Sequence, residues 1–127
     1  MENKDIHILL IDDEDGFRRP MEFWLKGKGY QVAGAASGEE GLKMVAKERP
    51  SIICLDMKMP GMNGIEVLRK IRETDKNLPV IMITAHGTPS DMEEAEKLGT
   101  SGFFRKDDDF ATAAKMILVA LESSKQN

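Results

Sequence analysis

The sequence predicts an α/β fold in which helices cover both faces of a five-stranded parallel sheet. Apolar runs of strand length alternate with amphipathic segments of helix length, and this unit occurs five times along the chain. Most of the apolar runs are continuous, as expected for strands that are buried on both faces. Because crossovers between parallel strands are right-handed, the topology is expected to be a doubly wound, three-layer sandwich.

The five strands are expected in the apolar runs Ile6–Ile11, Tyr30–Ala36, Ser51–Leu55, Val80–Thr84 and Gly102–Arg105. The first helix is expected over Asp15–Lys28, because apolar residues recur there at spacings of three and four. A capping-box pattern at Ser37–Glu40 opens the second helix, and Pro50 follows its end. The last three helices are marked by apolar residues at helical spacing: Ile65, Leu68 and Ile71; Met92, Ala95 and Leu98; and Ala113, Met116, Ile117, Ala120 and Leu121.

Composition and charge narrow the class of protein. The 127 residues are 41% hydrophobic and 31% charged, which is typical of one soluble domain, expected here over about 5–122 with a polar tail at 123–127. A net charge of −4 without a basic stripe argues against direct nucleic-acid binding. The longest apolar run is far shorter than the roughly 20 residues that cross a bilayer, and no secretory signal is present. We therefore expect a cytoplasmic protein with no membrane association.

Charged and polar residues stand where the predicted strands end. Asp12 and Asp13 follow the first strand, Asp56 the third, Thr84 ends the fourth and Lys106 follows the fifth. In doubly wound sheets, ligands bind outside the carboxyl ends of the strands. Carboxylates that converge there repel each other unless a cation neutralises them, and hard oxygen ligands suit Mg²⁺. The sequence therefore predicts a magnesium site at this edge.

The same residues fit the needs of phosphoryl transfer, which depends on a nucleophile, charge neutralisation and positioning. A carboxylate such as Asp56 can form an acyl phosphate. Mg²⁺, the ammonium of Lys106 and the hydroxyl of Thr84 would then contact the phosphoryl oxygens. Each of these groups has one plausible task in the reaction.

At these positions the sequence resembles the receiver domains of bacterial two-component response regulators, such as those of chemotaxis regulators. The resemblance covers nearly the whole chain and rests on four segments in order: Leu10–Glu14, Leu55–Gly64, Ile83–Ala85 and Gly102–Lys106. It implies a flavodoxin-like fold with strand order 2-1-3-4-5. It also implies a phosphorelay protein that is a substrate and a switch, not an enzyme, since it catalyses only its own phosphorylation and dephosphorylation.

The resemblance also implies a role for each site residue. Asp56 would accept the phosphoryl group, and Asp13 and Asp56 would bind Mg²⁺ directly, with the backbone carbonyl of Lys58 as a third ligand and Asp12 acting mainly through water. Lys106 would pair with the phosphoryl group, and Thr84 and Phe103 would be the switch residues. Lys58 and His86, each two residues after a site residue, would tune the lifetime of the phosphoryl group.

The implied partners are a sensor histidine kinase or a phosphotransfer protein. A homodimer would form through the face made by the fourth helix, the fifth strand and the fifth helix. The regulated output would lie in a partner or in a domain outside this chain, so both a stand-alone receiver and a piece of a longer regulator stay open.

One position departs from the family's pattern. Receivers commonly carry proline, usually after a cis bond, directly after the conserved lysine, but here Asp107 follows Lys106. A cis bond without proline costs about 2.5–4 kcal/mol, so we predict a trans bond and a locally altered loop. The acidic run Asp107–Asp109 is interpreted as a solvated helix start. The alternative is a loop displaced enough to alter switching or the partner surface.

Two other functions are compatible with parts of the sequence. The departure at Asp107 supports a receiver-like binding module that works without phosphorylation. A small phosphatase of the haloacid-dehalogenase type also uses a strand-end aspartate, but it carries a second aspartate two residues later, where this chain has Lys58. The chain also leaves no room for the cap insertions of those enzymes.

Overall fold

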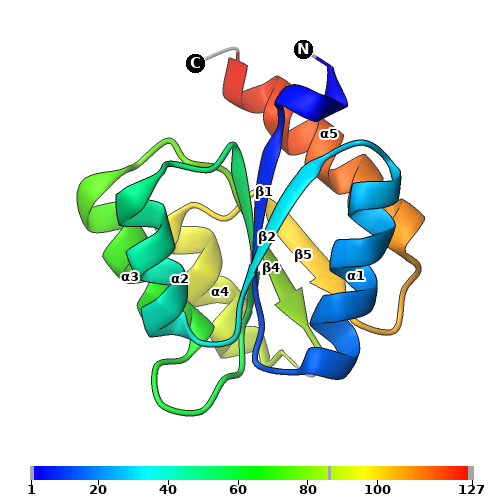
Figure 1. The fold of residues 1–127 in the computed structure, drawn as a ribbon. Coiled ribbons are helices and arrows are strands. Elements are labelled where there is room, and N and C mark those ends of the chain that lie inside the picture. The colour runs from blue at the N-terminus through cyan, green and yellow to red at the C-terminus, as the bar shows by residue number, and fades with distance from the viewer. Residues whose placement is uncertain (1, 86, 126–127) are drawn as a thin grey trace.

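The computed structural model describes residues 2–85 and 87–125, and in these residues five strands alternate with five α-helices (Figure 1). The strands are β1 (His7–Ile11), β2 (Gln31–Ala35), β3 (Ile52–Asp56), β4 (Val80–Thr84) and β5 (Gly102–Arg105). The helices are α1 (Asp15–Gly27), α2 (Gly38–Lys47), α3 (Gly64–Thr74), α4 (Pro89–Leu98) and α5 (Phe110–Lys125), and a short 3-10 helix, Asn3–Asp5, precedes β1. The predicted strands are confirmed to within one residue at each end.

All neighbouring strands are parallel, in the order β2-β1-β3-β4-β5. The fold class and the expected strand order are therefore confirmed. β1 lies between β2 and β3, so that Ile8 stands opposite Val32 on one side and Ile52 on the other. The chain reverses direction across the sheet between β2 and β3, which places the ends of β1 and β3 side by side.

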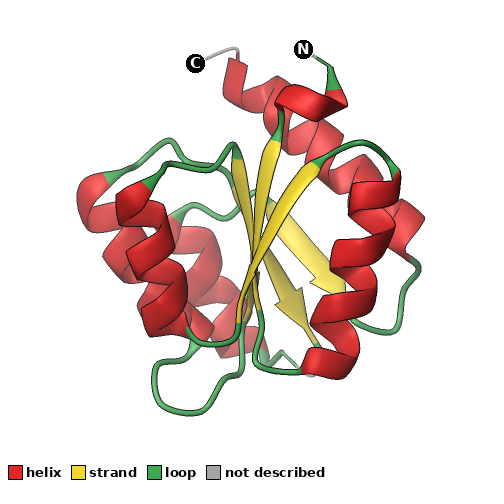
Figure 2. Cartoon of the chain, viewed as in Figure 1, coloured by secondary structure: helices red, strands yellow, loops and turns green. Residues whose placement is uncertain are grey.

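The sheet separates two apolar layers. Helices α1 and α5 cover one face, and α2, α3 and α4 cover the other (Figures 1 and 2). Alternate residues of β1 serve the two faces: Ile8 and Leu10 pack towards α1 and α5, whereas Leu9 and Ile11 pack towards the other three helices. Every residue of β3 and β4 is buried, which explains why these strands appear in the sequence as continuous apolar runs.

Helix starts are fixed by side-chain caps close to the carboxyl ends of the strands. Ser37 accepts the N–H of Glu40, which confirms the predicted capping of α2. Asn63 caps α3 and Thr88 caps α4 in the same way. These caps set where each loop after a strand ends, and so they limit the freedom of the loops that surround the site.

The carboxyl end of the chain differs from expectation. Helix α5 continues to Lys125, so the residues 123–125 that were expected in a polar tail are helical. The side chains of Ser123 and Ser124 do not stop the helix, because serine is only mildly unfavourable in a helix interior. Within the described residues, no helix combines the length and the apolar character that crossing a bilayer requires.

Candidate functional site

Five side chains predicted for the site gather at the carboxyl ends of the strands. Asp12 and Asp13 follow β1, Asp56 is the last residue of β3, and Thr84 is the last residue of β4. Lys106 directly follows β5, and its backbone N–H donates to the carbonyl of Thr84 at 3.0 Å. Because the strands are parallel, all five positions lie at one edge of the sheet.

The three aspartates form a tight acidic cluster. One carboxylate oxygen from each aspartate lies within 4.8 Å of the other two, and Asp13 is more exposed than Asp12 and Asp56. Burial first, and the nearby charge of Asp12 second, raise the pKa of Asp56 to about 7, although Lys106 and the N–H of Lys58 oppose this rise. Buried carboxylates at this distance repel each other when both are ionised, so the cluster favours a bound cation.

Asp12 shows that a divalent cation fits the cluster. Its Oδ1 accepts the N–H of Glu14 at 2.8 Å, whereas its Oδ2 is buried and has no hydrogen-bond partner among the described residues. Oδ2 lies 3.0 Å from the Nζ of Lys106, within ion-pair range but outside hydrogen-bond geometry. Among the described residues, the ion pair with Lys106 alone offsets the burial of this oxygen, and carboxylate oxygens are the donors that Mg²⁺ prefers. The donor set therefore suits Mg²⁺.

Lys106 supplies the positive charge of the site. Its Nζ contacts Asp12 and Glu14, lies 3.4 Å from the Oδ2 of Asp56, and stands 5.0 Å from the centre of the Phe17 ring. Burial alone would lower the pKa of Lys106, but the contacts with Glu14 and Asp12 and the charge of Asp56 raise it above its ordinary value. The ammonium is therefore charged and held against the acidic cluster.

Thr84 presents a buried hydroxyl that has no hydrogen-bond partner among the described residues. Gly87 lies against it, since a β-carbon on Gly87 would stand 2.8 Å from the Oγ1 of Thr84. Phe103 is half-buried in β5 and packs against the apolar layer that faces α2, α3 and α4. A hydroxyl with an unused donor is able to bind a phosphoryl oxygen.

Lys58 connects the end of β3 to α4. Its backbone N–H donates to the Oδ1 of Asp56 at 3.3 Å, and its Nζ pairs with the Oδ2 of Asp91 at 2.9 Å. Asp91 belongs to the first turn of α4, so its carboxylate holds the exposed Lys58 side chain at that helix. The metal-ligand role of the Lys58 carbonyl and the tuning role of its side chain stay predictions. His86, the other residue expected to tune the phosphoryl lifetime, lies outside the described residues.

The loop after Lys106 is held by its own side chains. None of the described peptide bonds is cis, so the trans bond predicted before Asp107 is confirmed. The carboxylate of Asp107 pairs with the guanidinium of Arg105 at 3.2 Å, and Asp109 accepts the N–H and the hydroxyl of Thr112, each at 3.0 Å. The bonds from Thr112 lower the pKa of Asp109. These two carboxylates bind neighbours other than Lys106, in agreement with a solvated helix start.

An aromatic group lies beside Lys106 and lines a shallow hollow with it. The ring centre of Phe110, the first residue of α5, stands 6.0 Å from the ring centres of Phe17 and of Trp24. Trp24 is therefore packed against the segment that follows the loop of Lys106. Its fluorescence is expected to report on movements of that loop.

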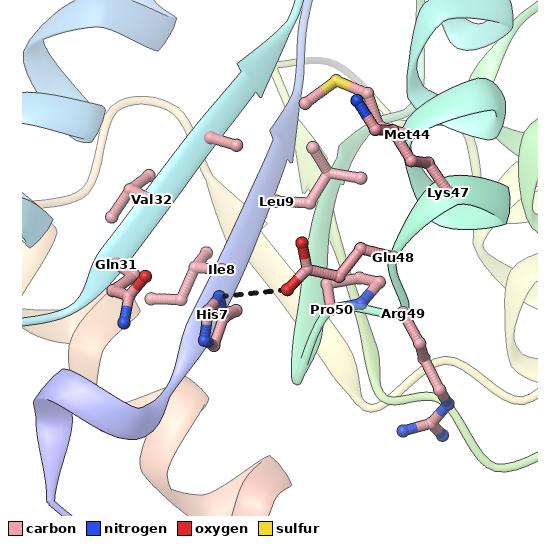
Figure 3. A pocket seen from close by; sticks show the side chains of 11 residues that line it. His7, Ile8, Leu9, Gln31, Val32, Met44, Lys47, Glu48, Arg49 and Pro50 are labelled. Carbon is pink, nitrogen blue, oxygen red and sulfur yellow. Dashed lines mark ion pairs between the residues drawn. The ribbon is translucent and has the colours of Figure 1, made fainter.

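A separate hollow of about 360 Å³ lies between the end of α2 and the amino-terminal halves of β1 and β2 (Figure 3). Leu9, Val32 and Met44 contribute apolar side chains to it, and the Nδ1 of His7 stands 4.0 Å from the Oε1 of Glu48 at its rim. None of the predicted site residues is among the described residues that line this hollow. The acidic cluster and this hollow lie at opposite ends of β1.

The sequence pattern assigns no role to four residues around the site. Glu14 and Gly87 stand next to motif residues, and this adjacency is a signal that could have identified them. Asp91 contacts Lys58, and Arg18 contacts the backbone carbonyl of Asp12 at 2.7 Å. Both contacts depend on how α4 and α1 pack on the sheet, and spacing along the chain does not reveal them.

The family model of the response regulator receiver domain matches residues 8–118. The chain belongs to this family. A receiver domain acts in two-component signalling, where it interacts with a histidine kinase or a phosphotransfer protein. This assignment, with Lys58 at the position of a second aspartate, excludes the haloacid-dehalogenase alternative.

Among the relatives of this receiver domain is the sporulation initiation phosphotransferase F of Bacillus subtilis (strain 168), 41% identical over 78% of this chain and 80% of that protein. The transcriptional regulatory protein AfsQ1 of Streptomyces coelicolor is 42% identical over 78% of this chain, but the match spans only 44% of that longer protein. The crystal structure of a response regulator receiver domain protein from Clostridium thermocellum superposes with a TM-score of 0.89, at 30% identity, over 95% of this chain and 98% of that one.

Proposed function

We propose that this receiver domain accepts a phosphoryl group on Asp56 in the presence of Mg²⁺. The observation that carries the proposal is a buried carboxylate with two donor groups beside it. Asp56 is 3% exposed, the ammonium of Lys106 lies 3.4 Å away, and the Thr84 hydroxyl at the end of the adjacent strand has no hydrogen-bond partner among the described residues. These groups provide a nucleophile and two donors for the charge on the transferred group.

The transfer step is a displacement at phosphorus. An oxygen of the ionised Asp56 carboxylate forms a bond to the phosphorus of the donor, and the bond from phosphorus to the donor's nitrogen or oxygen breaks with its electron pair on the donor. The product is an acyl phosphate on Asp56. Lys106 is already charged and needs no proton transfer before it pairs with the phosphoryl oxygens.

Asp12, Asp13 and Asp56, with the backbone carbonyl of Lys58, would hold the Mg²⁺ ion. When bound, this ion neutralises the clustered carboxylates and the incoming phosphoryl oxygens. The raised pKa of Asp56 supports the need for such a charge, because a nucleophilic carboxylate must be ionised. Asp12 supports it further, because its buried Oδ2 has no hydrogen-bond partner among the described residues.

Phosphorylation is proposed to shift this receiver between two conformations. Thr84 would turn towards the phosphoryl group, because the missing side chain of Gly87 leaves space beside its hydroxyl. Phe103 would move with Thr84. Lys58 and His86 would set how long the acyl phosphate lasts. The domain, about residues 5–122, would work in the cytoplasm and catalyse only its own phosphorylation and dephosphorylation.

The donor is proposed to be a sensor histidine kinase or a phosphotransfer protein, as the family assignment supports. The face formed by α4, β5 and α5 would carry a homodimer or a downstream partner. No contact with nucleic acid or with a membrane is proposed for this domain, whose net charge is −4.

The test is incubation of the protein with acetyl phosphate or phosphoramidate. Intact mass measures the gain of a phosphoryl group, and Trp24 fluorescence monitors the accompanying change. The expected result is the gain of one phosphoryl group that requires Mg²⁺ and is lost in Asp56→Asn. The matched control is Asp107→Asn, which removes a nearby carboxylate outside the acidic cluster and is expected to leave the gain unchanged. No gain with either donor would favour the binding module that works without phosphorylation.

A further inference from the structure

Arg18 is a buried cation that the proposed chemistry does not use. Only 8% of the residue is exposed, and all three kinds of guanidinium nitrogen are bonded. Nε donates to Glu22 at 3.2 Å, Nη1 to the backbone carbonyl of Asp12 at 2.7 Å, and Nη2 to Asp15 at 2.8 Å. A buried charged group with a hydrogen bond from each of its three nitrogens holds its neighbours in one arrangement.

The hydrogen bond from Arg18 to the carbonyl of Asp12 lies just beyond the end of β1. The N–H of Asp12 still donates to the carbonyl of Ala35 in β2 at 3.0 Å, but β1 ends one residue earlier, at Ile11. The carbonyl of Asp12 belongs to the peptide that joins Asp12 to Asp13. Arg18 therefore fixes the orientation of the peptide plane from which the Asp13 side chain departs.

Arg18 is itself held by Glu22, whose carboxylate is seated over Gly34 of β2. A β-carbon on Gly34 would stand 2.5 Å from Oε2, 2.7 Å from Cδ and 2.9 Å from Oε1 of Glu22. Any side chain at this position would push the carboxylate away from its present place. The absence of a side chain on an edge strand thus determines where Glu22 meets Arg18.

We infer that Arg18 is a positioning residue for metal binding, kept in place by Glu22 over Gly34. It orients Asp12 and Asp13 in advance, so that their carboxylates meet Asp56 without a further loss of backbone freedom when a cation binds. This inference rests on the proposed Mg²⁺ site. It adds three residues to that proposal: Arg18 and Glu22 on α1, and Gly34 on β2. Within the acidic cluster, Arg18 contacts only a backbone carbonyl.

Two substitutions separate geometry from charge. Arg18→Lys keeps the positive charge, but an ammonium cannot reproduce the planar fork that reaches Glu22, Asp12 and Asp15 together. Gly34→Ala changes none of the charges and displaces only the far end of the flexible Glu22 side chain, so the fold is expected to persist. Partners that orient metal ligands typically affect metal affinity by about 10- to 100-fold. We expect each variant to bind the metal about tenfold more weakly.

The first measurement is the affinity for Mn²⁺ of wild type, Arg18→Lys and Gly34→Ala. Electron paramagnetic resonance of the free ion monitors the binding. The matched control is Gly27→Ala, which lies on α1 with nothing within 4 Å of its added β-carbon and should bind Mn²⁺ as the wild type does. Far-ultraviolet circular dichroism checks that each variant is folded.

The second measurement is the rate of phosphorylation by acetyl phosphate against Mg²⁺ concentration. A positioning role raises the half-saturating Mg²⁺ concentration about tenfold and leaves the rate at saturation nearly unchanged, since weaker outer partners reduce affinity. Equal Mn²⁺ affinity in wild type and in the folded Gly34→Ala variant would overturn the inference, whatever Arg18→Lys does. Failure of the wild type to bind Mn²⁺ would instead overturn the proposed metal site.

Discussion

At the scale of single residues, Asp56 is placed where ionisation is unfavourable. Its carboxylate is buried beside Asp12, and these two causes raise its pKa to about 7, against the opposing effect of Lys106. Without a metal ion the native state therefore carries an electrostatic cost at the proposed phosphoacceptor. This cost is part of what would attract a cation, and it can be measured as stability.

We predict that Asp56→Asn stabilises the metal-free protein at alkaline pH. The folded pKa of about 7 lies above the unfolded value near 3.9, so between these values the native state binds a proton that the unfolded state has lost. Stability of the wild type therefore falls as pH rises through this window. At about pH 8 in EDTA, the variant should be more stable by on the order of 2–4 kcal/mol.

The measurement is urea denaturation of wild type and variant between about pH 5 and pH 8, in the range where the pKa shift acts. The difference in the free energy of unfolding should shrink towards pH 5. A difference that stays constant across this range would show that the titration of Asp56 does not cause it.

A second prediction concerns the space beside Thr84. In Gly87→Ala the new β-carbon would stand 2.8 Å from the Oγ1 of Thr84 and must displace the hydroxyl. Loss of a whole donor to a reacting oxygen costs about 100- to 1,000-fold, so a displaced donor should slow phosphorylation by about tenfold. Rates with acetyl phosphate test this. Gly16→Ala, with nothing within 4 Å of its β-carbon, is the matched control, and equal slowing in both would contradict the prediction.

The site residues differ in how far the sequence could predict them. Asp12, Asp13, Asp56, Thr84 and Lys106 follow or end strands, so the strand pattern alone places them at one edge of the sheet. Arg18 gave no such signal, because an arginine on an amphipathic helix is usually exposed and its burial here depends on how α1 packs on the sheet. The contact between Lys58 and Asp91 likewise depends on the position of α4, which spacing along the chain does not fix.

At the scale of elements, side-chain caps and guanidinium groups hold the helices in place on the sheet. Arg72 of α3 donates from Nε to the carbonyl of Leu98 and from Nη2 to that of Gly99, each at 2.9 Å. Its Nη1 donates to the carbonyl of Asp75 at 3.0 Å. One side chain therefore closes the end of α3 and binds carbonyls that the end of α4 leaves unpaired.

We predict that Arg72→Ala destabilises the fold by about 1.5–3 kcal/mol, as expected for hydrogen bonds to a charged group, and loosens α4 in particular. The matched control is Arg69→Ala on the same helix, which loses an exposed ion pair with Glu94 and should cost less than about 1 kcal/mol. Denaturant unfolding measures the costs. Hydrogen exchange should show faster opening of α4 only in Arg72→Ala, and equal behaviour of the two variants would contradict this.

Helix α1 carries an internal weak point. Pro20 lies inside it, is exposed, and cannot donate to the carbonyl of Gly16 one turn earlier. We predict that Pro20→Ala stabilises the protein by about 1–3 kcal/mol, because it restores this bond and removes the clash of the proline ring with the preceding turn. Arg19→Ala, an adjacent exposed position, is the control with little expected effect. Thermal unfolding that shows no gain for Pro20→Ala would be the contrary result.

The elements were largely predictable because each one buries a regular apolar face. Periodicity identified α1 despite Pro20, since the apolar residues around it keep their spacing of three and four. The end of α5 was not predictable, because the residues 123–125 are polar and carry no periodic signal. Their helical form follows from continuation of the preceding turns.

At the scale of the whole molecule, cation binding should act as a stabilising ligand. The three carboxylates of the acidic cluster come together only in the folded chain, so an ion that they bind favours the native state. We predict that Mg²⁺ at 100 times its dissociation constant raises the free energy of unfolding by about 2.7 kcal/mol. Urea denaturation at constant ionic strength tests this. Asp13→Asn should lose the effect, and an equal gain in that variant would assign it to nonspecific screening.

The topology could be predicted only in part. Alternation of strands and helices leads to a parallel, doubly wound sheet, but strand order depends on where the chain reverses direction, and no spacing fixes that point. The order 2-1-3-4-5 came from the resemblance to receiver domains and is confirmed. The pairing of β1 with β3 is what brings Asp12 and Asp56 to adjacent strand ends.

The sheet between the two apolar layers also separates the residues proposed to position the metal ligands from a residue proposed to take part in switching. Arg18 and Glu22 stand on α1, on one face, whereas Phe103 packs with α2, α3 and α4 on the other. If Arg18 positions the metal ligands and Phe103 takes part in switching, as proposed, substitutions that change these two roles fall in separate packing environments. Selection can then change metal affinity without repacking the switch residue.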